Sequence, residues 1–362
     1  MPELYIGLMS GTSLDGVDAA LVDFSAGQQL LASHFLPYSD ALRTEALALN
    51  SAGANEIHRA SNFSNAVAEL YAQATMNLLE SSGVAAMAIK AIGAHGQTIR
   101  HRPDCGYTVQ VCNASLLAER TGIAVVCDFR SRDIAAGGQG APLVPAFHAA
   151  TFASNRTHRL ILNIGGIANL TDLPCSGPVK GFDTGPGNLL LDAWCARHTG
   201  QRFDLDGAWS AKGKVIGGLL AQFKEEPFFR LPPPKSTGRD LFNEAWLQQY
   251  DLSSYASVDV QATLLELSAQ SITDSAAAFC AGAIEIYVCG GGAANGVLMN
   301  RIQANAPHMK VDNTQALGLH PDWVEAIAFA WLARQSLNNA AGNLPEVTGA
   351  TGPRVLGAIY PK

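Results

Sequence analysis

Short apolar runs, many of them touching a glycine, alternate along the chain with longer segments in which apolar and polar residues mix at helical spacing. The short runs predict strands, and they read LYIGLM, AALVDF, IKAIGAHG, AVVCDF, RLILNIGG, EIYVCGGG and RVLGAIYP. The longer segments predict helices over residues 55–82, 143–154, 188–200, 260–282 and 322–339. Because strands and helices interleave, the sequence predicts an α/β fold.

At three places an apolar strand runs into a glycine turn. The first is GLMSGTSLDGVD at residues 7–18, the second is LILNIGGIANLTDL at residues 160–173, and the third is IYVCGGGAANGVLM at residues 286–299. A plain β-hairpin explains either of the first two turns when each is taken alone. Two hairpins followed by a strand–GGG–helix form a more specific order, which predicts two similar α/β halves that face a central cleft.

Glycine turns of this kind suit the phosphates of a nucleotide. Glycine lets the backbone approach a ligand closely, and bare N–H groups in a turn form a nest for anions. We expect the first two turns to bind phosphates, and the triple glycine to let adenosine lie against backbone near a helix N-terminus. The sequence has no GxxxxGK[ST] and no GxGxxG that opens a βαβ unit, which argues against P-loop and dinucleotide-binding folds.

Composition narrows the class of protein. The 362 residues are 48% hydrophobic and 15% charged, which is enough for two domains with substantial cores. The net charge of −7 argues against a nucleic-acid or polybasic membrane surface. No apolar run approaches the ~20 residues of a membrane span, and no secretory signal is visible, so we expect a cytoplasmic protein. The 7 cysteines include no CxxC pair and the 9 histidines no HExxH, so we expect reduced thiols and no dedicated transition-metal site.

The segment GFDTGPGN, residues 181–188, carries the candidate catalytic residue. Asp183 ends an apolar strand and precedes a glycine turn, where a carboxylate is costly unless it is hydrogen-bonded. It either orders that turn and the helix that follows, or it acts as a catalytic acid or base. The proline-dense stretch 225–243 predicts a long rigid loop, a kind of segment that often has a function.

Several long motifs resemble those of the anhydro-N-acetylmuramic acid kinase family, within the actin-like ATPase superfamily. They are GLMSGTSLDGVDAALV (7–22), GAHGQTIRH (93–101), CDFRSRDIAAGGQGAPLVPAFH (127–148), LNIGGIANLT (162–171), GFDTGPGN (181–188), PPPKSTGRDLFN (232–243), VCGGGAANGVLM (288–299) and NLPEVTGA (343–350). The resemblance spans essentially the whole chain. It implies two actin-like (ribonuclease H-like) domains, residues 1–140 with 342–362 and residues 141–341, around a central nucleotide and substrate cleft.

The resemblance also implies an activity. Members of the family use ATP to phosphorylate 1,6-anhydro-N-acetylmuramic acid while water opens its anhydro bridge, which gives N-acetylmuramic acid 6-phosphate in bacterial cell-wall recycling. It implies Asp183 as the general base, Mg²⁺ with the ATP, and a homodimer. A kinase for another sugar or small carboxylate, or a non-kinase ATPase of the same fold, stays open as an alternative.

The expected ATP-binding residues lie in the three glycine turns, and they are Gly11, Thr12, Ser13, Leu14, Asp15, Gly16, Val17, Asp18, Gly165, Gly166, Gly290, Gly291 and Gly292. Asp15 and Asp18 are the candidate Mg²⁺ ligands by position only. Gly7 and Asn163 stand near the places where many superfamily members have aspartate.

The expected substrate-binding residues are His95, Gln97, Thr98, Arg100, Arg130 and Glu325. The first four follow a predicted strand and offer donors and acceptors for hydroxyl and acetamido groups. Arg100, Arg130 or Arg132 is the candidate partner of the lactyl carboxylate.

Purely structural roles are the alternatives to these assignments. A salt bridge to a neighbouring acid, such as Asp128 or Asp133, is the alternative for each arginine. Asp322 and Glu325 have the spacing of a capping box at the start of a helix, and capping is the simpler role for Glu325.

Overall fold

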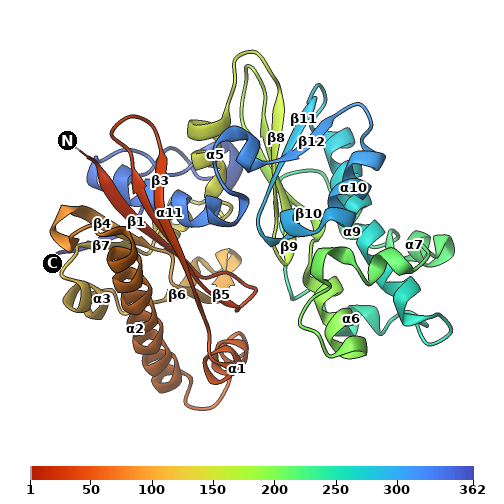
Figure 1. The fold of residues 1–362 in the computed structure, drawn as a ribbon, viewed down its shortest axis with the longest axis horizontal. Helices are drawn as coiled ribbons and strands as arrows, with labels where there is room; N and C mark the ends of the chain where they lie inside the picture. The colour runs from red at the N-terminus through yellow and green to blue at the C-terminus, as the bar shows by residue number, and fades with distance from the viewer. Residues whose placement is uncertain (1) are drawn as a thin grey trace. The chain divides into compact units, whose positions relative to one another are not determined.

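The computed structural model describes residues 2–362, which form two compact units (Figure 1). Unit 1 comprises the chain up to Thr151 together with Trp323–Lys362, and unit 2 comprises Phe152–Asp322. These boundaries differ from the expected ones at residues 140/141 and 341/342. The two helices that the expected division assigned to the second domain, α5 (Val144–Phe152) and α11 (Val324–Leu337), lie almost entirely within unit 1.

Unit 1 is built from a sheet with helices on its faces. Its strands are β1 (Leu4–Met9), β2 (Gly16–Asp23), β3 (Gln29–Pro37), β4 (Ile89–Ala94), β5 (Gln97–Arg102), β6 (Tyr107–Val111), β7 (Val125–Cys127) and β13 (Ala358–Tyr360). Its helices are α1 (Asp40–Leu49), α2 (Glu56–Ser82), α3 (Ala114–Thr121), α4 (Ser131–Ala135), α5, α11 and α12 (Pro345–Thr348).

The main sheet of unit 1 has the strand order β13-β7-β4-β1-β2-β3. β1, β2 and β3 form an antiparallel meander, whereas β4 and β7 continue from β1 in parallel. β5 and β6 pair as a separate hairpin. Helix α2 packs on β2 and β3, and its buried residues recur every three or four positions, as in Val67, Tyr71, Thr75 and Leu78.

Helix α11 lies against the other strands of this sheet because two glycines leave room for its backbone. Gly7 of β1 pairs in register with Gly93 of β4. A Cβ on Gly7 would stand 1.8 Å from the carbonyl oxygen of Ala326, and one on Gly93 would stand 2.0 Å from that of Phe329. Any side chain at either position would push the helix away, so the pair fixes α11 in unit 1 rather than in unit 2.

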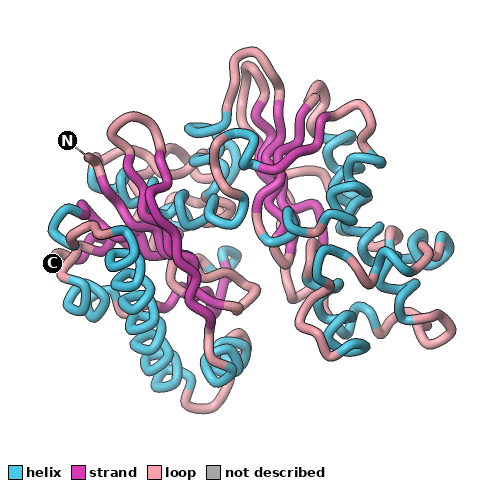
Figure 2. Tube along the Cα trace, in the orientation of Figure 1, coloured by secondary structure: helices cyan, strands magenta, loops and turns pink. Residues whose placement is uncertain are grey.

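Unit 2 repeats the same plan. Its strands are β8 (Arg159–Ile164), β9 (Ile167–Leu173), β10 (Lys180–Pro186), β11 (Glu285–Cys289) and β12 (Lys310–Asn313), and its helices are α6 (Leu189–Thr199), α7 (Gly217–Phe223), α8 (Glu244–Leu247), α9 (Ser257–Phe279) and α10 (Gly296–Asn305). The sheet order is β10-β9-β8-β11-β12, with β8, β9 and β10 antiparallel and β11 and β12 parallel to β8. Figure 2 shows the strands of each sheet in magenta with the helices in cyan.

Five strands of unit 1, in the order β7-β4-β1-β2-β3, therefore match the sheet of unit 2 in order and direction, and β13 is an additional edge strand antiparallel to β7. In each set of five, a hairpin meander forms one side and two parallel strands form the other. This repeat is the one expected from the recurring strand–glycine pattern. All seven predicted strands and all five predicted helices are present, with ends that shift by a few residues, so the α/β fold class is confirmed.

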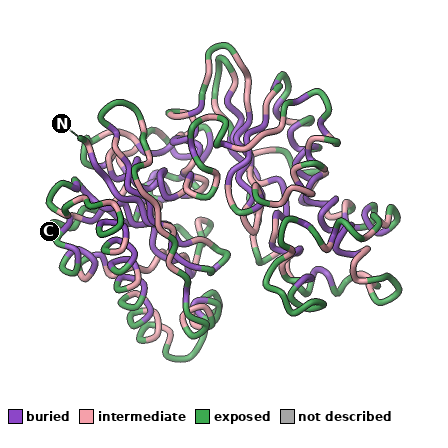
Figure 3. Tube along the Cα trace, in the orientation of Figure 1, coloured by how far each residue is buried: buried purple, intermediate pink, exposed green. Residues whose placement is uncertain are grey.

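Each unit has its own hydrophobic core, visible as the purple segments of Figure 3. The core of unit 1 joins β1, β2 and β4 to α2 and α3. The core of unit 2 joins β8, β9 and β11 to α6, α9 and α10, and it includes the aromatic side chains Phe223, Phe242 and Trp246. Within residues 2–362, no helix combines the length and the apolar character that a membrane crossing requires.

Candidate active site

Asp183 lies at a β-bulge in β10 of unit 2. Asp183 pairs with Asn169 of β9 and Gly185 with Ala168, so Thr184 is an extra residue on the β10 side. The Thr184 hydroxyl is buried and donates to the carbonyl oxygen of Ala168 at 3.2 Å. Asp183 was expected to end a strand, but it lies in the middle of β10, which continues to Pro186. A bulge re-aims the side chains beside it, and here it sets the direction of the Asp183 carboxylate.

The proline-dense loop holds this carboxylate. The backbone N–H of Thr237 donates to Oδ2 of Asp183 at 2.9 Å, and the backbone N–H of Asp183 donates to the carbonyl oxygen of Lys235 at 3.1 Å. Burial raises the pKa of Asp183 to about 6, although the Thr237 N–H, the Ser236 side chain and the Lys235 charge each act to lower it. A carboxylate with a pKa close to neutral suits a general base.

The alternative role for Asp183, ordering the turn and helix that follow it, is not what the structure shows. Helix α6 has Asn188 as its N-cap residue, and no side chain caps it. The turn is instead ordered by the Gly165–Gly166 hairpin. The carbonyl oxygen of Gly165 accepts the N–H of Asn188 at 2.9 Å, and that of Gly166 accepts the N–H groups of Gly187 and Leu189 at 2.9 and 3.0 Å.

The second hairpin and the strand of Asp183 therefore form one substructure. A Cβ on Gly187 would stand 2.4 Å from the carbonyl oxygen of Gly165, so the chain after β10 passes directly over the hairpin. This close approach explains the glycine in the motif TGPGN. It also links the candidate base to a candidate phosphate-binding turn through backbone contacts alone.

The triple glycine serves two purposes. Gly290 has a φ of 79°, and a Cβ there would stand 2.3 Å from Oδ1 of Asn163; one on Gly292 would stand 2.3 Å from Cγ2 of Ile164. These two glycines are required by packing against the end of β8. Nothing lies within 4 Å of a Cβ built on Gly291, so this position alone leaves space for a ligand. Oδ1 of Asn163 is buried and has no hydrogen-bond partner among the described residues.

In the first hairpin only part of the expected segment is exposed. Leu14 and Val17 are buried in the core, with Leu14 at a φ of 56°, and Gly16 packs against Phe35 and the carbonyl oxygen of Leu36. The side chains of Thr12, Ser13 and Asp15 are exposed. The Ser13 hydroxyl donates to Oδ1 of Asp15 at 2.6 Å.

Gln97 supports this hairpin through hydrogen bonds of its side-chain amide. Its amide nitrogen donates to the carbonyl oxygen of Gly11 at 3.2 Å, and its amide oxygen accepts from the hydroxyl of Tyr38 at 3.0 Å. Ser10 shares a hydrogen bond of 2.7 Å with the hydroxyl of Tyr71. Because Gln97 is buried and both ends of its amide are engaged, its visible role is to position the hairpin.

His95 connects the hairpin to Arg130. Nδ1 of His95 lies 3.1 Å from the carbonyl oxygen of Ser10, and its Nε2 lies 2.9 Å from a terminal nitrogen of Arg130. Burial, together with the Arg130 charge, lowers the pKa of His95 to about 3. The imidazole is therefore neutral, with Nδ1–H donating to Ser10 and Nε2 accepting from the guanidinium.

Arg130 is a candidate anion ligand, because one of its nitrogens is buried without a hydrogen-bond partner within residues 2–362. Its other terminal nitrogen donates to the carbonyl oxygen of Gly140 at 2.9 Å, and its Nε has no partner among the described residues. Burial lowers its pKa to about 10, against the opposing charges of Glu325 and Asp133. The structure thus gathers three expected residues, His95, Arg130 and Glu325, in one part of unit 1.

Arg100 forms a salt bridge, as the alternative role for the arginines predicted, but its partner is not one of the expected acids. Arg100 binds Glu56 at the start of α2 at 2.6 Å, and neither Asp128 nor Asp133. Asp128 accepts from the Ser131 hydroxyl at 2.5 Å. Thr98 accepts from the side chain of Gln110 at 3.2 Å across the β5–β6 hairpin.

Asp133 is a buried structural residue, although from the sequence it was expected only as a partner for an arginine. Its Oδ1 accepts from Asn343 at 2.6 Å and from Thr348 at 2.8 Å, and its Oδ2 accepts the N–H of Gly140 at 2.8 Å. These bonds join the GGQGAP loop to the C-terminal motif NLPEVTGA. A buried acid with this many neutral donors is a link between segments rather than a catalyst.

The capping-box expectation is wrong. Helix α11 has Trp323 as its N-cap residue, and no side chain caps it. A 3₁₀ turn, Pro321–Trp323, leads directly into the helix, and the carboxylate of Asp322 lies 3.7 Å from Nδ1 of His320. The charge of Glu325 acts on Arg130.

The exposed carboxylate of Asp15 fits a role with Mg²⁺. No group of three or more His, Cys, Asp or Glu side chains among residues 2–362 could hold a metal ion by itself. Mg²⁺ in kinases is bound by one or two carboxylates with substrate phosphates and water, so it needs no such cluster. Asp15 lies on the hairpin turn, whereas Asp18 lies within β2 opposite Met9 and is half-buried.

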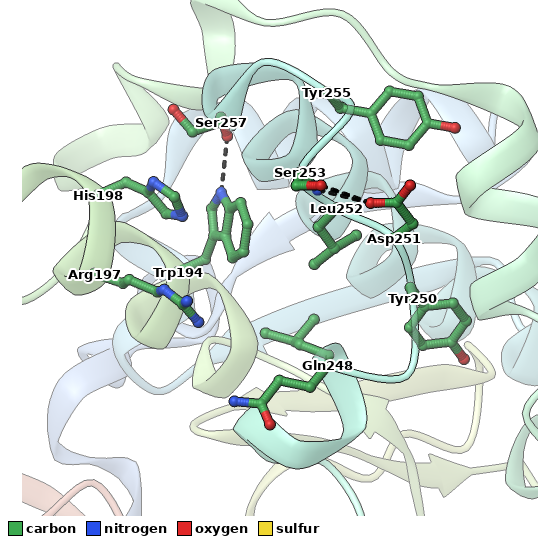
Figure 4. A pocket seen from close by; sticks show the side chains of 11 residues that line it. Trp194, Arg197, His198, Gln248, Tyr250, Asp251, Leu252, Ser253, Tyr255 and Ser257 are labelled. Atoms are coloured by element: carbon green, nitrogen blue, oxygen red, sulfur yellow. Dashed lines mark hydrogen bonds between the residues drawn. The ribbon is translucent and has the colours of Figure 1, made fainter.

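A cavity of about 410 Å³ lies elsewhere in unit 2 (Figure 4). It is lined by the last turn of α6 and by the segment from Leu247 to Ser257. Its polar groups bind one another: the indole nitrogen of Trp194 donates to the carbonyl oxygen of Ser257 at 2.8 Å, and Ser253 donates to Asp251. None of the expected site residues lines it.

The sequence did not indicate that Lys235 and Thr237 would lie beside Asp183, or that Gln97 would position the first hairpin. The proline-dense composition marked the loop as functional but did not indicate which residue it would place beside Asp183. Gln97 was recognised, but as a ligand for substrate.

Comparison with known proteins shows the family of the chain. The family model for anhydro-N-acetylmuramic acid kinase matches residues 3–362. The curated anhydro-N-acetylmuramic acid kinase of Nitrosomonas europaea is 57% identical over 360 residues, which covers 99% of each chain. That of Thiobacillus denitrificans is 56% identical over 368 residues, covering 99% of this chain and 97% of the relative.

Among solved structures, component A of the (R)-2-hydroxyglutaryl-CoA dehydratase of Acidaminococcus fermentans aligns with a TM-score of 0.50 at 12% identity, covering 91% of this chain and 96% of that one. This likeness concerns the fold alone, and it agrees with the expected actin-like α/β class. The match of the family model over nearly the full length shows more: the chain belongs to the anhydro-N-acetylmuramic acid kinase family.

Proposed function

We propose that the protein uses ATP to phosphorylate 1,6-anhydro-N-acetylmuramic acid while water opens the anhydro bridge. The products are N-acetylmuramic acid 6-phosphate and ADP, in peptidoglycan recycling. Family membership supports the substrate and the kinase activity. The observation that carries the hydrolytic step is the Asp183 carboxylate, held at a bulge by the Thr237 N–H with its pKa raised to about 6.

The proposed reaction needs one base. Water attacks the anomeric carbon, its proton passes to Asp183, and the bond from that carbon to the 6-oxygen breaks. An inverting glycosidase protonates the leaving oxygen with a second carboxylic acid. Here the departing 6-oxygen forms its new bond to the γ-phosphorus as the bond from phosphorus to ADP breaks, so phosphoryl transfer replaces that acid.

On the nucleotide side, we propose that Thr12, Ser13 and the two glycine hairpins bind the phosphates and that Gly291 contacts the adenosine. Asp15 would hold Mg²⁺, which neutralises phosphate charge when bound. On the sugar side, Arg130 would bind the lactyl carboxylate, because neutral His95 orients its guanidinium and its buried Nε has no partner among the described residues. We further propose a cytoplasmic homodimer.

Isotope incorporation tests the proposal. In water enriched in ¹⁸O, the product should carry one ¹⁸O at the anomeric carbon and none in the phosphate. Asp183→Asn should lower kcat by at least about 10³-fold, because the base is lost, while the Kd for ATP changes less than about threefold. A product without solvent oxygen at the anomeric carbon would mean an ordinary sugar kinase, and near-normal turnover in the variant would remove Asp183 as the base.

A further inference from the structure

Lys235 is a buried lysine beside the candidate base. It follows three consecutive prolines in the loop, and only 7% of its surface is exposed. Its ammonium group makes one long hydrogen bond, 3.4 Å to the carbonyl oxygen of Phe228. It also lies over the rings of Phe228 and Phe279, at 4.7 and 5.6 Å from their centroids.

Such a placement is costly for a charge. An ammonium group has three donors, and burying it among two phenyl rings and one carbonyl forfeits most of its hydration. Cation–π contacts of this kind recover less than the cost of burying the charge. A methionine or leucine would fill the same space with no desolvated charge. The placement therefore points to a use for the charge itself.

The backbone around Lys235 is bound to Asp183 on both sides. The carbonyl oxygen of Lys235 accepts the N–H of Asp183, and two residues later the N–H of Thr237 donates to its carboxylate. The stretch Lys235–Thr237 thus docks on the middle of β10 beside the carboxylate. Anchoring of the Lys235 side chain between two rings fixes where this stretch can lie.

We propose that Lys235 is a positioning residue for Asp183: its side chain anchors the Lys235–Thr237 turn on β10, and its charge favours the ionised carboxylate that accepts the proton of water. This inference rests on the function proposed above. It identifies a second residue that supports the action of the base, and it assigns a role to the PPPKST motif.

Other charged groups near β10 are engaged elsewhere. Lys180, at the far end of β10, lies 3.8 Å from Asp172 of β9, and Asp274 of α9 is paired with Lys224 at 2.7 Å. Arg230, on the 3₁₀ turn that packs against β10, is exposed. Among the described groups, Lys235 is the one whose charge acts on Asp183, and Asp183 in turn acts on Lys235.

The pH dependence of kcat/KM for the anhydrosugar tests the proposal with three variants. Lys235→Met removes the charge and keeps the bulk, Lys235→Arg keeps the charge, and Lys224→Met removes a half-buried, paired lysine of the same unit as a control. In the wild type, activity should fall as pH drops through about 6, because Asp183 gains a proton. Lys235→Met should move this limb up by about one pH unit, whereas Lys235→Arg and the control should not.

A second measurement needs no substrate. Amide hydrogen exchange at residues 235–237 should accelerate at least about tenfold in Lys235→Met and stay unchanged in Lys224→Met, because the turn loses its anchor. If the wild type lacks the proposed activity, the function fails while the exchange result still supports or rejects the anchoring. A Lys235→Met protein with the wild-type pH limb and wild-type exchange would overturn the inference. A Lys235→Met protein that loses the same fraction of kcat at every pH would also overturn it. If Lys235→Met does not fold, Lys235→Gln takes its place with the same expected results.

Discussion

Burial changes the protonation of two side chains of the candidate site in opposite directions. It raises the pKa of Asp183 to about 6, because the charged carboxylate is the form that loses hydration. It lowers the pKa of His95 to about 3, because there the charged form is the protonated one. The first shift gives a base that works near neutral pH. The second gives a neutral ring that accepts a hydrogen bond from Arg130 and orients it.

The shift of His95 predicts how stability depends on pH. The unfolded histidine binds a proton below about 6.5 and the folded one below about 3, so between these values the unfolded state holds more protons and stability falls as pH falls. His148, also buried with a pKa lowered to about 3, adds a second such contribution. We expect His95→Gln to reduce the slope of unfolding free energy between pH 6 and 4 by about 1.4 kcal/mol per pH unit.

Urea unfolding at several pH values measures this slope. His58→Gln, at an exposed position of α2, is the matched control and should leave the slope unchanged. An unaltered slope in His95→Gln would show that the imidazole is not neutral in the folded protein.

Glycines decide how close neighbouring elements come. Gly7 and Gly93 let the backbone of α11 lie on β1 and β4, and Gly187 lets the chain after β10 cross the second hairpin. In the triple glycine, the outer two residues pack against β8 while the middle one faces open space. One run of identical residues therefore combines structural and ligand-facing positions, which composition alone does not distinguish.

Two alanine substitutions in this run separate the two roles. Gly292→Ala should destabilise unit 2 by about 1–3 kcal/mol, because its Cβ would overlap Ile164. Gly291→Ala should leave the melting temperature within about 1 °C of wild type, since nothing lies within 4 Å, but should raise the KM for ATP several-fold if adenosine lies there. Thermal melts and ATP titrations check both, and an unchanged KM in Gly291→Ala would move the adenosine away from this turn.

At the scale of the whole molecule, two sheets that share a five-strand order each carry a separate core. Unit 2 is one continuous stretch of chain. Unit 1 is not, because α11 and the C-terminal segment return to it after unit 2 is complete. Asp133 binds this returning segment through Asn343 and Thr348.

This connectivity predicts an asymmetry between fragments. Residues 152–322 should fold alone with a cooperative melt, because their sheet and core are self-contained. Residues 1–151 should not, because without α11 one face of β1 and β4 is left uncovered. Circular dichroism and urea titration of both fragments would decide it, and a cooperative transition for residues 1–151 would show that α11 is dispensable.

The sequence by itself determined the α/β class, the strands and helices, the repeated hairpins and the family. These follow from apolar periodicity, glycine positions and long contiguous motifs, which are local properties of the chain. It also singled out Asp183, because an acid next to apolar strand residues is unusual, although it lies in the middle of β10 and not at its end. The expected domain boundary differs from the division into the two units, since nothing in the pattern of 322–339 indicates which sheet that helix covers.

Only the tertiary structure decided what the side chains of the site contact. Thr237, which donates to the Asp183 carboxylate, is more than 50 positions away from it in the sequence. The hydrogen-bonded pairs Gln97–Gly11 and Asp133–Asn343 are also more than 50 positions apart. Such pairs form because packing places their elements together, and no local pattern encodes them. For the same reason, burial and the pKa shifts that follow from it belong to the folded protein and not to the residue types.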